Sequence, residues 1–118
     1  NHTSLSAALE LLEKFTGKIL LSAPHQEFLE KTMLETTTGA DKLKGLLPPG
    51  TPVGHKTGSS DRNTNGLKAA DNDMGFVVLP DGRHFTIAVF VMDSMEDDKT
   101  NASIIAQIAK AAYDYYSH

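Results

Sequence analysis

Hydrophobic residues recur every three or four positions through the first part of the chain, which is the spacing of one face of a helix. The pattern predicts a helix over residues 4–16, capped by the hydroxyl of Thr3 or Ser4. A second helix is predicted over residues 24–35, where Pro24 falls in the first turn and its missing N–H costs nothing. The residues expected on the buried side of this second helix are Phe28, Leu29, Met33 and Leu34.

The middle of the chain changes from the helical period to an extended one. Strands are predicted at about residues 53–59, 73–79 and 84–92, and the polar, glycine-containing segment 60–72 is predicted to be a loop. The strand over 84–92 is apolar at nearly every position, which predicts that both of its faces are covered.

A last helix is predicted at about residues 101–116, after an acidic loop whose charge favours the positive end of the helix dipole. The residues expected on its inward face are Ile104, Ile105, Ile108, Ala112 and Tyr116. The order of these elements predicts one α+β domain over residues 1–118, with an antiparallel sheet meander flanked by helices.

Composition and charge narrow the class of protein. With 118 residues, the chain has room for one small domain. Eleven basic and fifteen acidic residues give a net charge of −4, which argues against a general nucleic-acid binder. No apolar run approaches the roughly 18 residues of a membrane span. From the charge and the lack of such a run, we expect neither nucleic acid nor membrane as a partner. The sequence has no cysteine and no histidines at metal-ligand spacing, so we expect no metal site, and we expect no cofactor.

Residues 54–60 place a lysine, hydroxyl groups and glycine at the end of a predicted strand. Gly58 would let a ligand approach the backbone closely, so that the N–H of Ser59 could face an oxyanion. Lys56 would supply positive charge and Thr57 a hydroxyl donor, which together suit a substrate carboxylate. The alternative is an ordinary solvent-exposed strand end that carries polar residues.

A nucleotide-binding P-loop is a further interpretation of this segment. Gly50 and the pair Lys56-Thr57 stand at the separation of the motif G-x-x-x-x-G-K-[ST]. His55 replaces the glycine before the lysine, however, and the residues that follow favour a loop rather than the helix that the motif requires. We therefore rank this interpretation last.

Several short motifs follow one another in an order that is typical of one enzyme family. They are Thr36-Thr37-Thr38-Gly39, Leu47-Pro48 with Gly50, Lys56-Thr57-Gly58, Asn72-Asp73-Met74-Gly75, Leu79-Pro80-Asp81-Gly82, and Ile87–Val91 with Asp93-Ser94, before the closing helix. In this order the chain resembles the C-terminal part of a class A serine β-lactamase, close to the extended-spectrum subgroup of Bacteroides and its relatives. The resemblance covers the whole chain and implies the β-lactamase/transpeptidase-like fold.

The resemblance implies two catalytic residues and a set of substrate-binding residues. Lys56 would shape the field around the active serine and help to bind the substrate carboxylate, to which Thr57 would hydrogen-bond. The backbone N–H of Ser59 would be one of two oxyanion-hole donors, and Ser60 would border the pocket. The implied substrate-binding residues are Thr38, Lys42, Thr57, Gly58 and Ser60.

Lys42 stands three residues after Gly39, where relatives with the same threonine-glycine segment often carry an arginine. That arginine would be an extra anchor for the substrate carboxylate. Lysine keeps the charge but lacks the planar fork of arginine.

The family's S-x-x-K and S-D-N motifs are not found in this sequence, where Ser60-Asp61 is followed by Arg62. The chain begins at Asn1 rather than Met, so we expect it to be a processed or truncated piece whose nucleophile and deacylating glutamate lie in a complementary N-terminal part. The whole protein should then hydrolyse β-lactams by serine acyl transfer, in the periplasm or after secretion. The chain alone should be inactive, fold poorly and associate through the open edge of the strand over 84–92.

Two alternatives from this reasoning stay open. A penicillin-binding D,D-peptidase of the same fold is one, because the glutamate that would decide between them is not in the chain. A non-catalytic module that binds carboxylates or a partner protein is the other, because the nucleophile is missing.

Overall fold

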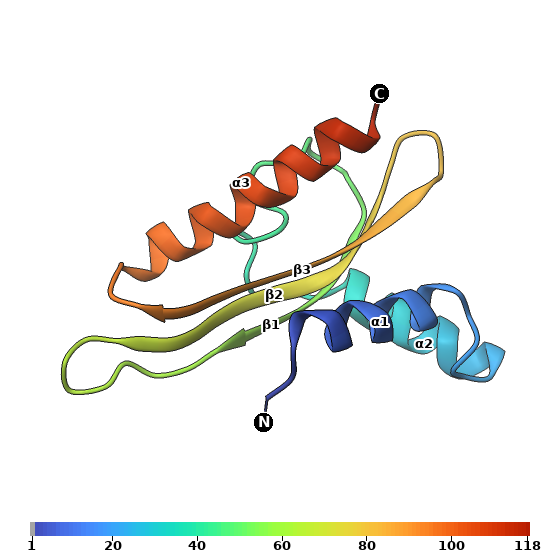
Figure 1. Cartoon of the computed structure of the whole chain (residues 1–118). Coiled ribbons are helices and arrows are strands. Elements are labelled where there is room, and N and C mark those ends of the chain that lie inside the picture. Colours follow the sequence, from blue (N-terminus) through green and yellow to red (C-terminus); the bar gives the residue numbers. More distant parts are fainter. Residues whose placement is uncertain (1) are drawn as a thin grey trace.

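An antiparallel sheet lies at the centre of the molecule, with helices on both of its faces (Figure 1). This computed structural model describes residues 2–118. Its strands are β1 (Val53–Ser59), β2 (Lys68–Val78) and β3 (His84–Ser94), which pair in the order β1-β2-β3. Helix α3 (Asp98–Tyr116) covers one face of the sheet. The predicted α+β fold, a meander flanked by helices, is confirmed.

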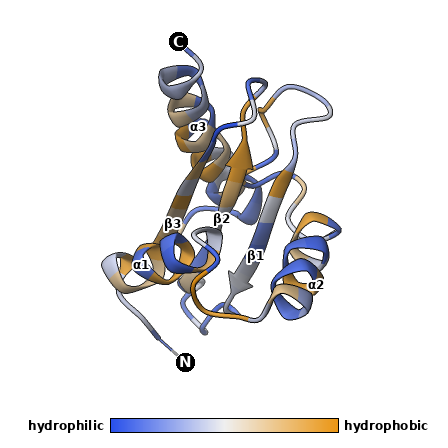
Figure 2. Cartoon of the chain, turned by 90° about the vertical axis from the view of Figure 1, so that its right-hand side faces the viewer, coloured by the Kyte–Doolittle hydropathy of each residue, from blue (hydrophilic) through white to orange (hydrophobic). Residues whose placement is uncertain are grey.

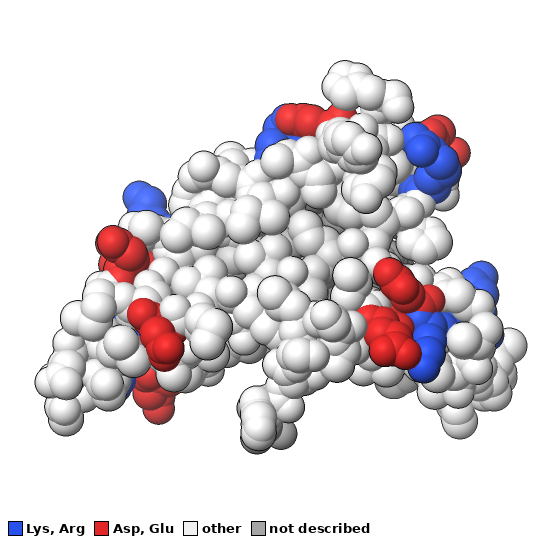
Figure 3. All heavy atoms as spheres, viewed as in Figure 1, with Lys and Arg blue, Asp and Glu red and all other residues white. Residues whose placement is uncertain are grey.

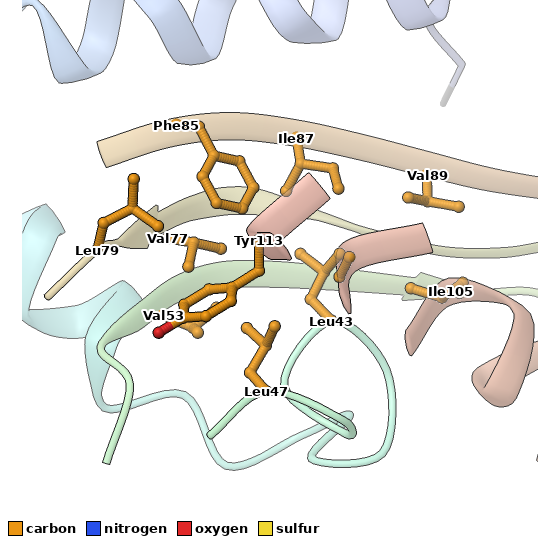
Figure 4. Packing of buried hydrophobic residues seen from close by; sticks show 11 residues of the cluster. Leu43, Leu47, Val53, Val77, Leu79, Phe85, Ile87, Val89, Ile105 and Tyr113 are labelled. Atoms are coloured by element: carbon orange, nitrogen blue, oxygen red, sulfur yellow. The ribbon is translucent and has the colours of Figure 1, made fainter. Parts of the chain in front are cut away.

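The main hydrophobic core lies between α3 and the sheet and is closed by the segment that joins the second helix to β1 (Figure 4). Leu43 from that segment, Val77 from β2 and Ile105 from α3 are fully buried there. Burying apolar area of this kind contributes roughly 25 cal/mol per Å². The core therefore fixes the position of β1, which carries the candidate site.

Helix α1 (Leu5–Thr16) covers the other face of the sheet, where it contacts β2 and β3. The hydroxyl of Ser4 caps it by accepting a hydrogen bond at 3.1 Å from a backbone N–H of the first turn. Leu12 and Phe15 are buried, and the ring of Phe15 lies 6.4 Å from that of Phe76 on β2. This contact anchors α1 on the sheet.

Helix α2 (Ala23–Leu34) lies beside β1 (Figure 2), and the prediction of its buried side was wrong. Phe28 is 71% exposed, and Leu29 and Leu34 are also exposed. The buried residue of α2 is instead Gln26, whose amide donates a hydrogen bond at 2.8 Å to the carbonyl of Phe15 at the end of α1. A polar link between the helices, rather than an apolar face, sets the orientation of α2.

Helix α3 turns a different face inward from the one predicted. Ile105 is buried and Ala112 packs against the core, but Ile104, Ile108 and Tyr116 are exposed. Small side chains at helical spacing let α3 lie close to the sheet. The buried residues of α3 are Asn101, Ala102, Ile105, Ala106, Ala109 and Tyr113.

Strand β2 begins at Lys68, five residues before the predicted start at 73, so the loop after β1 is shorter than expected. Lys68, Asp71 and Asp73 are all buried and are paired with opposite charges or with histidine. Because these side chains are polar, the sequence pattern of this half of the strand is that of a loop.

Strand β3 is covered less completely than predicted. Phe85, Ile87 and Val89 are buried, while Met92 is 72% exposed. No helix in the described part of the chain is both long enough and apolar enough to cross a membrane.

Candidate active site

The end of β1 presents backbone donors along the outer edge of the sheet. Ser59 lies opposite Asp71 of β2, and the next residue, Ser60, donates its N–H to the carbonyl of Ala70 at 2.8 Å. Successive residues of a strand direct their N–H groups to opposite sides. The N–H of Ser59 therefore points away from β2, and the residue is exposed.

The face of β1 that carries Lys56 and Gly58 borders an open hollow of about 640 Å³. Asn72 and Met74 of β2 lie opposite these two residues and line the same hollow. The ammonium of Lys56 donates to the carbonyl of Thr57 and is exposed. The structure thus brings Lys56, Thr57 and Gly58 to one open surface.

The threonine-rich turn after α2 is docked against β1. The hydroxyls of Thr38 and Thr57 lie 3.1 Å apart, and the hydroxyl of Thr36 donates to the carbonyl of His55 at 3.1 Å. Gly39 follows with a φ of +65°, and a Cβ there would lie 2.5 Å from the methyl group of Thr57. Thr38 and Thr57 therefore offer two adjacent hydroxyl groups at the outer side of β1.

Lys42 does not lie at this open edge. Its side chain is buried, with the ammonium 2.7 Å from a carboxylate oxygen of Asp71 and 3.2 Å from the carbonyl oxygen of Asn72. The predicted role of Lys42 as an anchor for a substrate carboxylate does not fit this geometry, because its charge is already neutralised inside the protein.

Ser60 uses its side chain to close the hairpin after β1. Its hydroxyl oxygen accepts a hydrogen bond from the N–H of Ala70 at 3.1 Å, and it donates to the carbonyl of Asp61 at 3.1 Å. The residue is half-buried at the border of the exposed strand end. Its hydroxyl is thus committed to shaping the backbone around Ser59.

The model of the Beta-lactamase enzyme family matches residues 1–116 of this chain. The chain belongs to that family. A beta-lactamase of Bacteroides uniformis is 56% identical over 115 residues, which are 97% of this chain and 39% of the relative.

Solved structures of β-lactamases share the fold closely. The TLA-3 extended-spectrum beta-lactamase superposes with a TM-score of 0.97 and 52% identity, over 98% of this chain and 42% of that one. A class A beta-lactamase from Bacteroides cellulosilyticus superposes with a TM-score of 0.94 and 50% identity, over 98% of this chain and 42% of that one. The chain thus spans about two fifths of the length of these relatives, and its class A membership is confirmed.

Beneath the site, this member of the beta-lactamase family contains a buried pair that the sequence reasoning missed. Nδ1 of His55 lies 2.9 Å from the carboxylate of Asp73, and both side chains are fully buried. The same carboxylate accepts the backbone N–H of Leu43 at 3.2 Å. The pair therefore joins β1, β2 and the segment before β1 directly below Lys56 and Thr57.

A second missed cluster surrounds Asp71. Burial works to raise the pKa of its carboxyl, but the hydrogen bond and charge of Lys42, together with Lys68 and Asn101, outweigh it and hold that pKa below the usual range. The hydrogen bond that the Lys68 ammonium donates to Asp98, with the charge of Asp71, raises the pKa of that ammonium against the opposing effect of burial. The signal that could have revealed the cluster is the alternation of aspartates at 71 and 73 in a strand register.

No group of three or more histidine, aspartate or glutamate side chains within residues 2–118 is arranged to hold a metal ion. The exposed edge offers hydrogen-bond donors and one ammonium group. Such groups bind anions and stabilise developing negative charge on oxygen.

Proposed function

We propose that the protein containing this chain hydrolyses β-lactams by serine acyl transfer. In that reaction the serine oxygen bonds to the lactam carbonyl carbon, the ring C–N bond breaks, and the nitrogen takes a proton. Water then cleaves the ester to release the open-ring acid. The observation that carries the proposal is the outward-pointing N–H of Ser59 beside Lys56 and Thr57, in a chain of this family.

Each residue of this edge has a part in the proposed reaction. The N–H of Ser59 stabilises the oxyanion that forms on the lactam carbonyl oxygen, since donors fixed in advance need no reorganisation. The hydroxyl of Thr57, supported by that of Thr38, binds the substrate carboxylate, and Lys56 supplies the positive charge. Gly58, without a side chain, leaves room for the substrate against the strand.

The nucleophile and the deacylating base come, in this proposal, from a complementary N-terminal part of the same protein. Support comes from the large apolar side chains that the described chain leaves exposed, among them Ile19, Phe28 and Met92. Strand β3 also has one edge that pairs with no strand among residues 2–118. Figure 3 shows a broad middle region of one face without charged side chains, as expected for a surface that another segment covers.

The test uses the whole protein and its two parts with a chromogenic cephalosporin. We expect turnover by the whole protein, none by the 118-residue chain, and recovery when the complementary N-terminal part is added. Hydrolysis by this chain alone would contradict the proposal. A whole protein that forms a long-lived acyl-enzyme instead of turning over would be a D,D-peptidase, and one that forms no acyl-enzyme would be a binding module.

We propose a periplasmic or secreted location, because β-lactams act on cell-wall synthesis outside the cytoplasmic membrane and an enzyme that destroys them is effective there. Fractionation of cells that express the whole protein tests this. Activity confined to the cytoplasmic fraction would contradict it.

A further inference from the structure

Asp71 stands directly behind the proposed oxyanion donor. Its backbone lies opposite Ser59 in the β1–β2 ladder, and its side chain points to the face of the sheet that α3 covers. The side chain is 2% exposed and carries a charge that the proposed reaction does not use. A buried carboxylate persists only where cations and donors surround it.

Lys42 reaches Asp71 from the other side of β1. It belongs to the turn whose Thr38 touches Thr57 on β1, yet its ammonium contacts Asp71 and the carbonyl of Asn72 on β2. These two residues lie opposite Ser59 and Gly58. The turn and β2 therefore hold the last residues of β1 between them.

Lys68 forms the second arm of the cluster. Its ammonium lies 3.4 Å from Asp71 and 3.0 Å from Asp98 in the first turn of α3. Arg62, in the hairpin after β1, also binds Asp98 at 2.7 Å and donates to the carbonyl of Glu96. The hairpin that follows Ser59 is thereby tied to the start of α3.

We propose that Asp71 is a positioning residue for the Ser59 amide, because its carboxylate holds Lys42 and Lys68 on the two sides of this strand end. The inference rests on the proposed function for its catalytic consequence. Without the carboxylate, the buried ammonium of Lys42 would lose its acidic partner and Lys68 would keep Asp98 alone, so the turn or the hairpin would move. Either movement changes the direction of the Ser59 N–H, which contacts the reacting carbonyl.

The decisive readout is the infrared band of the ester carbonyl in the acyl-enzyme of the whole protein. A well-placed N–H polarises that carbonyl and lowers its stretching frequency, whereas a displaced one lets the frequency rise. A purely structural role would lower stability and the amount of active protein without changing the band of the molecules that react.

The variants are Asp71→Asn and Lys42→Gln, with Lys42→Arg as the conservative rescue. Asp114→Asn is the matched control, since Asp114 also pairs with a lysine, Lys110 at 2.6 Å, but on the exposed side of α3. We expect the first two variants to raise the carbonyl frequency and to lower the acylation kcat/KM about 10- to 100-fold, because a displacement of about 1 Å at a reacting group has effects of that order. Lys42→Arg should bring the carbonyl frequency and the acylation kcat/KM most of the way back to the wild-type values. Asp114→Asn should change neither of these two quantities.

Unchanged ester bands in both Asp71→Asn and Lys42→Gln would overturn the inference. If Asp71→Asn does not fold, Lys42→Gln decides, because it leaves the carboxylate in place and removes one of its cations. Failure of the wild-type protein to form an acyl-enzyme would instead contradict the proposed function. The positioning of Ser59 is then tested by its amide NMR resonance, which should shift in Asp71→Asn and not in Asp114→Asn, and an unshifted resonance would overturn it.

Discussion

At Thr57, the proposed role of the hydroxyl in substrate binding can be tested without changing the shape of the side chain. Replacing Thr57 with valine keeps the β-branched shape that suits a strand but removes the hydroxyl that pairs with Thr38. In the whole protein we expect KM for a β-lactam to rise about 10-fold or more, because a hydrogen bond to a charged group contributes roughly 1.5–3 kcal/mol. Steady-state kinetics measure this, with Thr57→Ser as a control that should stay near the wild type. An unchanged KM in Thr57→Val would show that the hydroxyl does not bind the substrate.

Gly39 is a second residue with a definite expectation. Its φ of +65° disfavours any side chain, and a new Cβ would meet the methyl group of Thr57. We expect Gly39→Ala to lower the free energy of unfolding by about 1–3 kcal/mol and to reduce activity, since the turn must move away from β1. Denaturant unfolding of the whole protein measures the loss. Gly50→Ala is the comparison, because Gly50 also has a positive φ, +84°, but no atom lies within 4 Å of its Cβ position. If Gly39→Ala and Gly50→Ala lost activity equally, the contact between residue 39 and Thr57 would not explain the loss.

At the scale of elements, the cluster that joins the hairpin to α3 makes stability depend on pH. The folded pKa of Asp71 is lowered, so its contribution is present above the unfolded value of 3.8 and is lost as the pH falls through the lower folded value. The folded pKa of Lys68 is raised, so its contribution is present below 10.5 and is lost as the pH rises through the higher folded value. Thermal unfolding across the acid range should show a steeper loss below about pH 4 for the wild type than for Asp71→Asn. If the wild type and Asp71→Asn lost thermal stability equally steeply as the pH falls, the contribution assigned to Asp71 would be contradicted.

The elements also show what could be predicted from the sequence. Local signals such as the cap at Ser4 and the nearly continuous apolar run over residues 84–92 depend on neighbouring residues, and they indicate the elements found there. Which face of α2 or α3 is buried depends on residues far away in the chain, and there the prediction failed for Phe28 and Ile108. At the site, the edge position of Ser59 was inferred from its strand context. The burial of Lys42 could not be inferred from the sequence, because its partner Asp71 is 29 residues away and lies in a segment with a polar, loop-like pattern.

Residues 2–118, taken as a whole, leave a large apolar surface that no other described residue covers. Exposed side chains such as Leu11, Met92 and Ile108, together with the free edge of β3, favour association with another chain. We expect the 118-residue chain alone to form oligomers or aggregates that light scattering detects, and the complementary N-terminal part to suppress them. A monomeric chain with one cooperative thermal transition would contradict this and would favour an independent binding module. The matched control is a variant with Met92→Lys, which places a charge at the exposed edge and should reduce association.

The ladder between β1 and β2 ends at a rung where the hydroxyl of Ser60 accepts the N–H of Ala70. Beyond it, the two arms of the hairpin are joined by the bridge between Arg62 and Lys68 and by the hydrogen bond from the N–H of Asn63 to the carbonyl of Leu67. Insertions or deletions at the tip, around residues 63–67, therefore fall on the far side of that rung. A tip of different length would therefore leave the amide of Ser59 in register with β2.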